Sequence, residues 1–355
     1  MTQQAGQTEP LPGVKSHPAR PHADWIDFAK ACAMFLVVLG HCTLIPRYDR
    51  AVIYTFHVPA FLFLSGAVLS RHLGQIPYGT FLRQKILPLV RLYGFFSACS
   101  VAIFAVGLIW SGLDWVTPVT ASVTALLNGV HGPTNAFGHM NTPLWYFPFL
   151  VVSLCAMRLA ASLPFAVGGL LMAALAWLGL HSADTIYPWY LNFAGIGGLF
   201  IWAGWAVAVH GPAVAARLHD KTVVTVLLLV AVIVGMMLLP EWRVRPNINN
   251  AEFGPSGRLY FTAAFAGIAM LCLLGCLVPA TAAIRLLSQH TTVIFCIHIY
   301  LLRGAENMLG YDHKSLKMAI LLAAIVTVVS LGLSVLIMPA LRRYVIRPGA
   351  PQPKA

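Results

Sequence analysis

Three ionisable residues, Asp27, Lys30 and His41, lie in the first apolar stretch of the sequence, residues 26–45. On an α-helix, the positions of Lys30 and His41 differ by roughly 20° from full turns, and Asp27 lies about 40° to the other side of His41, so all three share one face. The helical rise separates Lys30 from His41 by about 16 Å. Because an ionisable group at membrane depth costs about 2.5–3.5 kcal/mol, this face is predicted to meet a cavity or a protein partner rather than lipid.

Histidine is the residue of this set best suited to catalysis. Its side chain titrates near neutral pH, so an imidazole can remove a proton from a hydroxyl as a general base. Asp27 and Lys30 have a simpler alternative role, as a neutralising pair three residues apart that helps the helix insert. That alternative leaves His41 unexplained, which favours a functional role for His41.

Four further residues are candidates for substrate binding. His57 follows a short hairpin connection and is expected near the outer surface with His41, so the two imidazoles could share one cavity. Asn141 and Trp145 precede the fourth apolar stretch, and His298 lies within the ninth. The alternatives are an interfacial structural role for His57 and membership of an aromatic belt for Trp145.

A cluster of basic side chains lies between the second and third apolar stretches, without an acidic residue: Arg71, Arg83, Lys85 and Arg91. Guanidinium groups match phosphate oxygens, so the cluster could bind a phosphate-bearing cofactor at the inner mouth of the bundle. Topological anchoring is an equally good interpretation. No metal site is predicted, because the sequence has no His-Glu-x-x-His or paired-cysteine spacing.

The elements that must position these residues are membrane helices. Of the 355 residues, 59% are hydrophobic and 10% are charged, and mean hydropathy is +0.77, which nearly excludes a soluble domain. The apolar runs are continuous rather than alternating, which favours helices over a membrane barrel. An all-α polytopic membrane protein with about ten spans is predicted, at 26–45, 52–70, 87–110, 144–161, 164–180, 190–209, 222–239, 259–278, 290–303 and 318–340.

The basic residues indicate the orientation of these spans. With the N-terminus inside, 14 of the 23 Lys and Arg residues fall in inner segments and 8 in outer ones. This distribution predicts N-in and C-in and explains the net charge of +12 without a nucleic-acid partner. The expected domains are a disordered cytoplasmic tail (1–23), a transmembrane domain (24–343) and a second cytoplasmic tail (344–355), with an outer loop over 111–143. The expected location is the cell inner membrane.

Several sequence segments together resemble the membrane-bound acyltransferase family 3, whose members O-acylate sugars and other envelope molecules. They are IDFAKACAMFLVVLGH, FHVPAFLFLSG, FLRQKILPL, PLWYF and IFCIHIY, and the resemblance covers roughly residues 24–340. The family's basic residue, ten intervening residues and histidine match Lys30 and His41. The resemblance implies that His41 is catalytic and that Lys30 is its required partner.

The resemblance implies transfer of an acyl group, most simply acetyl, from cytoplasmic acyl-CoA to a hydroxyl of an exported or cell-envelope glycan such as cellulose. The CoA phosphates would meet the basic cluster, and Lys30 would hold donor phosphate or balance Asp27. Expected partners are the glycan acceptor, the lipid bilayer and a polysaccharide synthesis and export complex. The alternatives are a secondary transporter or flippase that uses the charged face as its path, and a structural subunit that would not require His41.

Overall fold

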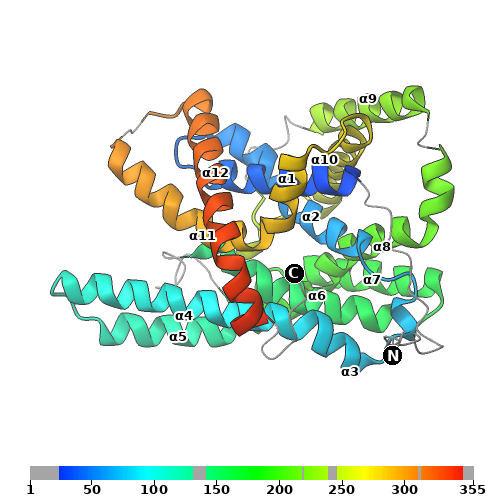
Figure 1. Cartoon of the computed structure of the whole chain (residues 1–355). Coiled ribbons are helices and arrows are strands. Elements are labelled where there is room, and N and C mark those ends of the chain that lie inside the picture. The colour runs from blue at the N-terminus through cyan, green and yellow to red at the C-terminus, as the bar shows by residue number, and fades with distance from the viewer. Residues whose placement is uncertain (1–23, 131–140, 218–219, 239–245, 311–312, 347–355) are drawn as a thin grey trace, which may run out of the picture.

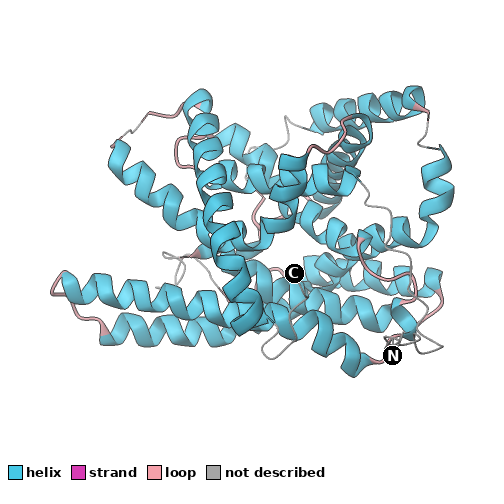
Figure 2. Ribbon diagram, viewed as in Figure 1, coloured by secondary structure: helices cyan, strands magenta, loops and turns pink. Residues whose placement is uncertain are grey.

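The computed structural model describes residues 24–130, 141–217, 220–238, 246–310 and 313–346, with the side chains of 212–217 and 236–238 left out (Figure 1). The predicted N-terminal tail and most of the predicted C-terminal tail lie outside these residues. The described chain is helical throughout and forms no strand (Figure 2). Its one strand-like pairing is an isolated bridge between Asn247 and Glu252.

Ten long helices coincide with the ten predicted spans. They are α1 (Asp24–His41), α2 (Arg47–Ala67), α4 (Leu87–Trp110), α6 (Tyr146–Ala160), α7 (Phe165–His181), α8 (Ala194–Arg217), α9 (Lys221–Leu238), α10 (Gly257–Leu277), α11 (Ala282–Leu309) and α12 (Leu316–Leu341). Among the described residues, seven helical segments are long and apolar enough to cross a bilayer. Three of them are α2, α10 and α11, and the other four contain α4, α6, α8 and α12 together with short helices that adjoin them, at Tyr78–Trp110, Thr142–Ala160, Pro188–Gly211 and Leu316–Ile346. The prediction of an all-helical, multi-pass membrane protein is confirmed.

The predicted outer loop over residues 111–143 is wrong in part, because it contains helix α5 (Val116–Asn128). This helix has 13 residues, fewer than a membrane span needs, so its apolar stretch is too short to predict a span. Its Thr120, Ser122 and Thr124 hydroxyls donate to backbone carbonyls four residues earlier, which satisfies them within the helix. α4 and α5 form a hairpin that extends to one side of the other helices (Figure 1).

The bounds of α2 and α11 also differ from the prediction. α2 begins at Arg47 rather than residue 52, so Arg47 to Arg50 form its first turn and not a loop. α11 is longer at both ends than the expected span 290–303. The Thr281 hydroxyl accepts a hydrogen bond from the Ile284 backbone N–H at its start, and Gly310 adopts a left-handed conformation at its end.

Helix α1 lies at the centre of the bundle, packed against α2, α10, α11 and α12. Small residues permit the close helix crossings. A Cβ at Gly66 of α2 would lie 2.0 Å from the Ile201 carbonyl oxygen of α8, and one at Gly204 of α8 would lie 1.8 Å from the Phe63 carbonyl oxygen of α2. Gly66 and Gly204 therefore let α2 and α8 approach closely.

α1 and α11 run parallel and are joined at both ends. At their start, Arg285 of α11 forms an ion pair with Asp24 of α1 at 3.0 Å. At their other end, Glu306 of α11 accepts a hydrogen bond at 2.5 Å from the backbone N–H of Thr43, just beyond α1. These contacts fix the lengthwise register of the two helices.

Candidate active site

A cavity of about 400 Å³ lies where α1 ends and α2 begins. Its volume falls within the range of small-molecule binding sites. Polar and aromatic side chains make up much of its lining, which is formed by Val37, His41, Tyr54, His57, Val58, Thr142, Pro143, Trp145, Pro246, Asn247, Ile248, Asn249, Phe295, Ile299 and Arg303. It therefore brings together residues from α1, α2, α11 and two connecting segments.

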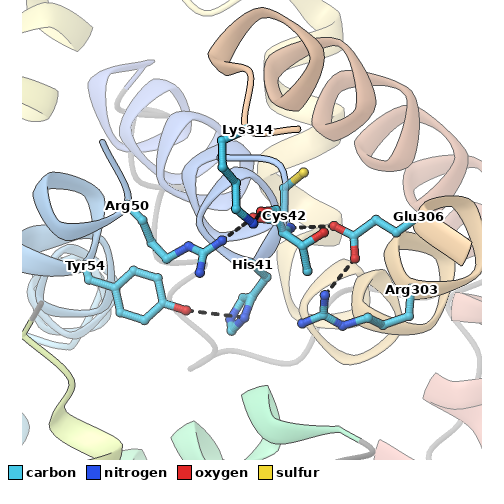
Figure 3. Close-up of polar contacts among 8 residues, drawn as sticks. His41, Cys42, Arg50, Tyr54, Arg303, Glu306 and Lys314 are labelled. Atoms are coloured by element: carbon cyan, nitrogen blue, oxygen red, sulfur yellow. Dashed lines mark hydrogen bonds and ion pairs between the residues drawn. The ribbon is translucent and has the colours of Figure 1, made fainter. Parts of the chain in front are cut away.

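His41 is the last residue of α1 and is partly exposed in this cavity. The Tyr54 hydroxyl of α2 lies 3.4 Å from His41 Nδ1 (Figure 3). The His298 ring of α11 flanks His41 with 5.4 Å between ring centroids. His41 thus faces the cavity and not lipid, with a titratable neighbour on each of two adjoining helices.

Backbone contacts fix the tautomers of the other two histidines. His57 Nδ1 lies 2.7 Å from the Ile53 carbonyl oxygen, and His298 Nδ1 lies 2.9 Å from that of Phe295. A carbonyl oxygen only accepts, so in both rings Nδ1 carries the proton, and Nε2 of the neutral ring is an acceptor. His57 lines the cavity, whereas His298 is fully buried behind it.

A polar network holds the loop that follows His41 (Figure 3). Glu306 accepts the Thr43 N–H through one carboxylate oxygen and pairs with Arg303 at 2.7 Å through the other. Arg50 donates to the Cys42 carbonyl oxygen at 2.7 Å, and Lys314 donates to that of Thr43. Since Arg303 also lines the cavity, this network connects the cavity wall to the end of α1.

Trp145 lies inside the bundle and not in an aromatic belt. It is 7% exposed, lines the cavity and stacks on Phe149 with 5.6 Å between ring centroids. The Tyr190 ring also packs against Trp145, at 5.5 Å, and its hydroxyl donates to Asn249 Oδ1 at 2.5 Å. Trp145 and Asn249 therefore belong to one connected part of the cavity wall.

The turn that carries Tyr190 is strained. Trp189 and Tyr190 both have φ of 58°, in the left-handed region that non-glycine residues rarely adopt. Hydrogen bonds secure both residues, because the Trp189 indole N–H donates to the Leu127 carbonyl oxygen of α5 and Tyr190 bonds to Asn249. The strained turn thus connects α5 to the Asn249 side of the cavity.

Asn141 lies beside the cavity without lining it. Its side chain is fully buried and donates to the Cys296 carbonyl oxygen of α11 at 3.1 Å and to the Ser100 hydroxyl of α4 at 3.4 Å. The Tyr300 hydroxyl also donates to Ser100, at 2.5 Å. These contacts hold the cavity-lining residues Thr142 and Pro143 against α11.

Asp27 and Lys30 do not line this cavity, because they lie toward the opposite end of α1 from His41. Asp27 is 4% exposed and accepts a hydrogen bond at 2.6 Å from the Ser288 hydroxyl of α11. Lys30 is half-buried one turn further along the helix. The structure places the two residues at the contact between α1 and the start of α11.

The four basic residues predicted to bind phosphate have different surroundings. Arg71, Arg83 and Lys85 are exposed, whereas Arg91 is half-buried and donates to the Ile346 carbonyl oxygen at 3.4 Å. Of the four, Lys85 lines a second cavity of about 370 Å³, formed by Val68, Leu69, Ser70, Leu73, Ile76, Phe81, Gln84 and Lys85. This cavity lies at the other end of α2 from His41.

Several residues around these cavities were not predicted from the sequence. Tyr54, Asn247 and Asn249 carry no motif, and their roles depend on contacts between distant segments. Arg158 carries no motif either, yet it is 6% exposed and donates to the carbonyl oxygens of Gly74 and Ile76 beside the second cavity. A buried arginine with backbone partners gives no signal in a single sequence.

Comparison with known families gives this cavity a chemical context. A model of an acyltransferase domain matches residues 23–339, which is most of the chain. The chain belongs to the acyltransferase 3 family. No curated protein and no solved structure matches it. The acyltransferase is a multi-pass membrane enzyme, so it requires an acyl donor and an acceptor as well as the bilayer.

Proposed function

We propose that this acyltransferase moves an acyl group, most simply acetyl, from acyl-CoA to a hydroxyl of an exported or cell-envelope glycan such as cellulose. His41 is the general base. The observation that carries this proposal is the position of His41, which lies in a cavity of about 400 Å³ among groups suited to binding a hydroxyl-bearing molecule. The inner membrane is the proposed location, with a polysaccharide synthesis and export complex as a partner.

The reaction needs one proton acceptor that later becomes a proton donor. An imidazole nitrogen of His41 takes the acceptor hydroxyl's proton as its oxygen attacks the thioester carbonyl carbon. The C–O bond forms, the C–S bond breaks, and the departing thiolate receives the proton from His41. General-base help of this kind is worth roughly 10² to 10⁴ in rate.

The cavity wall offers groups that fit a sugar. Asn247 and Asn249 present amides, which both donate and accept hydrogen bonds and so match hydroxyl groups. Trp145 supplies an apolar face for a pyranose ring. His57 lines this proposed acceptor region, and the nearby buried Asn141 and His298 support its walls.

The second cavity supports a donor route from the predicted cytoplasmic side. Along α2, His57 and Val68 are separated by about 16 Å, so the two cavities lie near opposite ends of one helix. An extended pantetheine arm suits such a distance. Lys85, Arg71, Arg83 and Arg91 are the proposed phosphate-binding residues, with Lys30 and Asp27 as the charged pair along the route.

The test is acyl transfer by purified protein with labelled acetyl-CoA and a soluble glycan acceptor. We expect His41→Ala to lower transfer by at least 10²-fold because the general base is lost. His181→Ala is the matched control, since His181 is an exposed histidine at the end of α7, and it should keep full activity. Transfer by His41→Ala at the wild-type rate and protein level would refute the assignment.

A further inference from the structure

We propose that His298 is a positioning residue for His41: it accepts a hydrogen bond from His41 when that ring becomes protonated during acyl transfer. The proposal rests on the proposed role of His41 as the base. It assigns to His298 a function in catalysis without contact to either substrate. The evidence is the burial, tautomer and placement of the His298 ring.

His298 presents a buried acceptor atom that has no hydrogen-bond partner among the described residues. The residue is 0% exposed, and its Nδ1 donates to the carbonyl oxygens of Ile294 and Phe295 at 3.1 and 2.9 Å. Its Nε2 is therefore an acceptor, and it is one of the buried atoms without a partner. A buried polar atom in this state costs stability, and such atoms are often kept for a functional reason.

The position of His41 makes it the natural partner for this atom. The two ring centroids are 5.4 Å apart with 48° between the ring planes. A small rotation at this separation brings a nitrogen of one ring within hydrogen-bond reach of the other, roughly 3 Å. The ties between α1 and α11, at Asp27–Ser288 and Thr43–Glu306, keep the two rings at this distance.

The protonation cycle explains when the hydrogen bond is needed. A neutral imidazole has one N–H, but the imidazolium has two, and one of them is used toward the reacting oxygen. The other requires a hydrogen-bond acceptor of its own. His298 supplies one in its neutral form, so it stabilises the cation without adding a second positive charge.

The other titratable or charged groups near His41 are on α2, on α11 and in the segment before α12. From α2, the Tyr54 hydroxyl lies 3.4 Å from Nδ1, and His57 contacts Tyr54 with 4.8 Å between ring centroids. From α11, Arg303 lines the cavity and is paired with Glu306, which also bonds to Thr43. On the α12 side, Lys314 donates to the Thr43 carbonyl oxygen.

The experiment compares two variants. His298→Phe keeps an aromatic ring but has no nitrogen, and His298→Gln places an amide, which can accept a hydrogen bond, near the position that Nε2 occupies in His298. We expect His298→Phe to lower kcat roughly 10- to 100-fold, as loss of a group that orients a functional histidine does, with the donor KM unchanged. His298→Gln should recover much of this loss. His290→Phe is the matched control, since His290 lies on the same helix and bonds to Ser334 of α12.

The pH dependence separates positioning from a structural role. Wild-type activity should fall as the pH is lowered and His41 is protonated. In His298→Phe the imidazolium of His41 has no hydrogen-bond acceptor, so His41 is easier to deprotonate. The acidic limb of the pH–rate profile should therefore move to lower pH in this variant. A loss of activity from misfolding would lower the rate at every pH and leave that limb in place.

Wild-type kcat and an unshifted acidic limb in His298→Phe would overturn the proposal while leaving the role of His41 intact. Activity in His41→Ala would instead refute the general base itself, so the two failures are distinguishable. His298→Met, which fills the site flexibly without a nitrogen, replaces the Phe variant if that protein does not accumulate. Equal loss in the Gln and Met variants would also count against the proposal.

Discussion

His41 ends α1, and this position matters for its chemistry. The C-terminal end of a helix carries partial negative charge, which stabilises a nearby imidazolium. The Tyr54 hydroxyl lies 3.4 Å from Nδ1, a distance at which a hydrogen bond is weak. The Tyr54 hydroxyl is therefore suited to orient the His41 ring, and the hydroxyl of an acyl acceptor can displace it.

Removing the Tyr54 hydroxyl tests this interpretation. Tyr54→Phe keeps the ring packed against His57 but loses the oxygen beside His41. We expect kcat to fall about 3- to 10-fold, which corresponds to one modest hydrogen bond, with little change in the donor KM. Initial rates over a range of labelled acetyl-CoA concentrations measure both kcat and the donor KM. A loss as large as that of His41→Ala would mean that Tyr54 itself carries the proton.

At the scale of elements, the loop from α1 to α2 is held by α11 and by the segment before α12. Glu306 accepts the Thr43 N–H, and the Ser315 N–H donates to the Leu44 carbonyl oxygen at 2.9 Å. The Glu306 side chain is 8% exposed, so its loss leaves a poorly solvated N–H. This single carboxylate joins the end of α1 to Arg303 in the cavity wall.

Glu306→Ala is expected to destabilise the protein by about 2 kcal/mol, because hydrogen bonds to a charged group are lost and a backbone donor is left without its partner. Thermal unfolding in detergent should show a lower Tm. Glu252→Ala, at an exposed glutamate, is the control and should change stability by less than about 0.5 kcal/mol. An unchanged Tm in Glu306→Ala would show that the loop is held by its other contacts alone.

At the scale of the whole molecule, the orientation in the membrane decides which compartment each cavity faces. The His41 cavity lies at the end of α1, and the Lys85 cavity lies at the other end of α2. The basic-residue distribution predicts that the first opens outward and the second inward. An acyl donor and an exported acceptor would then approach from opposite sides.

Reporter fusions at the C-terminus test this orientation. With the C-terminus inside, a green fluorescent protein fusion should fluoresce, and an alkaline phosphatase fusion should be inactive. A fusion after Asn128, at the end of α5, should give the opposite pattern, because that segment is predicted to lie outside. Active phosphatase at the C-terminus would reverse the assignment of donor and acceptor cavities.

Long-range contacts mark the limit of what the sequence could predict. Continuous apolar runs predicted all ten long helices, and the spacing of Lys30 and His41 singled out one of the two histidines that line the cavity. The short, threonine-rich α5 was missed because its length is below that of a span. Tyr54 and Asn249 were missed because their positions follow from packing between segments far apart in the sequence, such as the Tyr190–Asn249 bond.

The double attachment of α1 to α11 has a consequence for the surrounding lipid. Helices adjust to a thinner or thicker hydrocarbon layer by changing their tilt. Since Asp24 is joined to Arg285 and Thr43 to Glu306, neither helix can tilt without the other. A change in bilayer thickness would therefore move the His41 and His298 rings together. The distance between the two rings would then not depend on lipid composition.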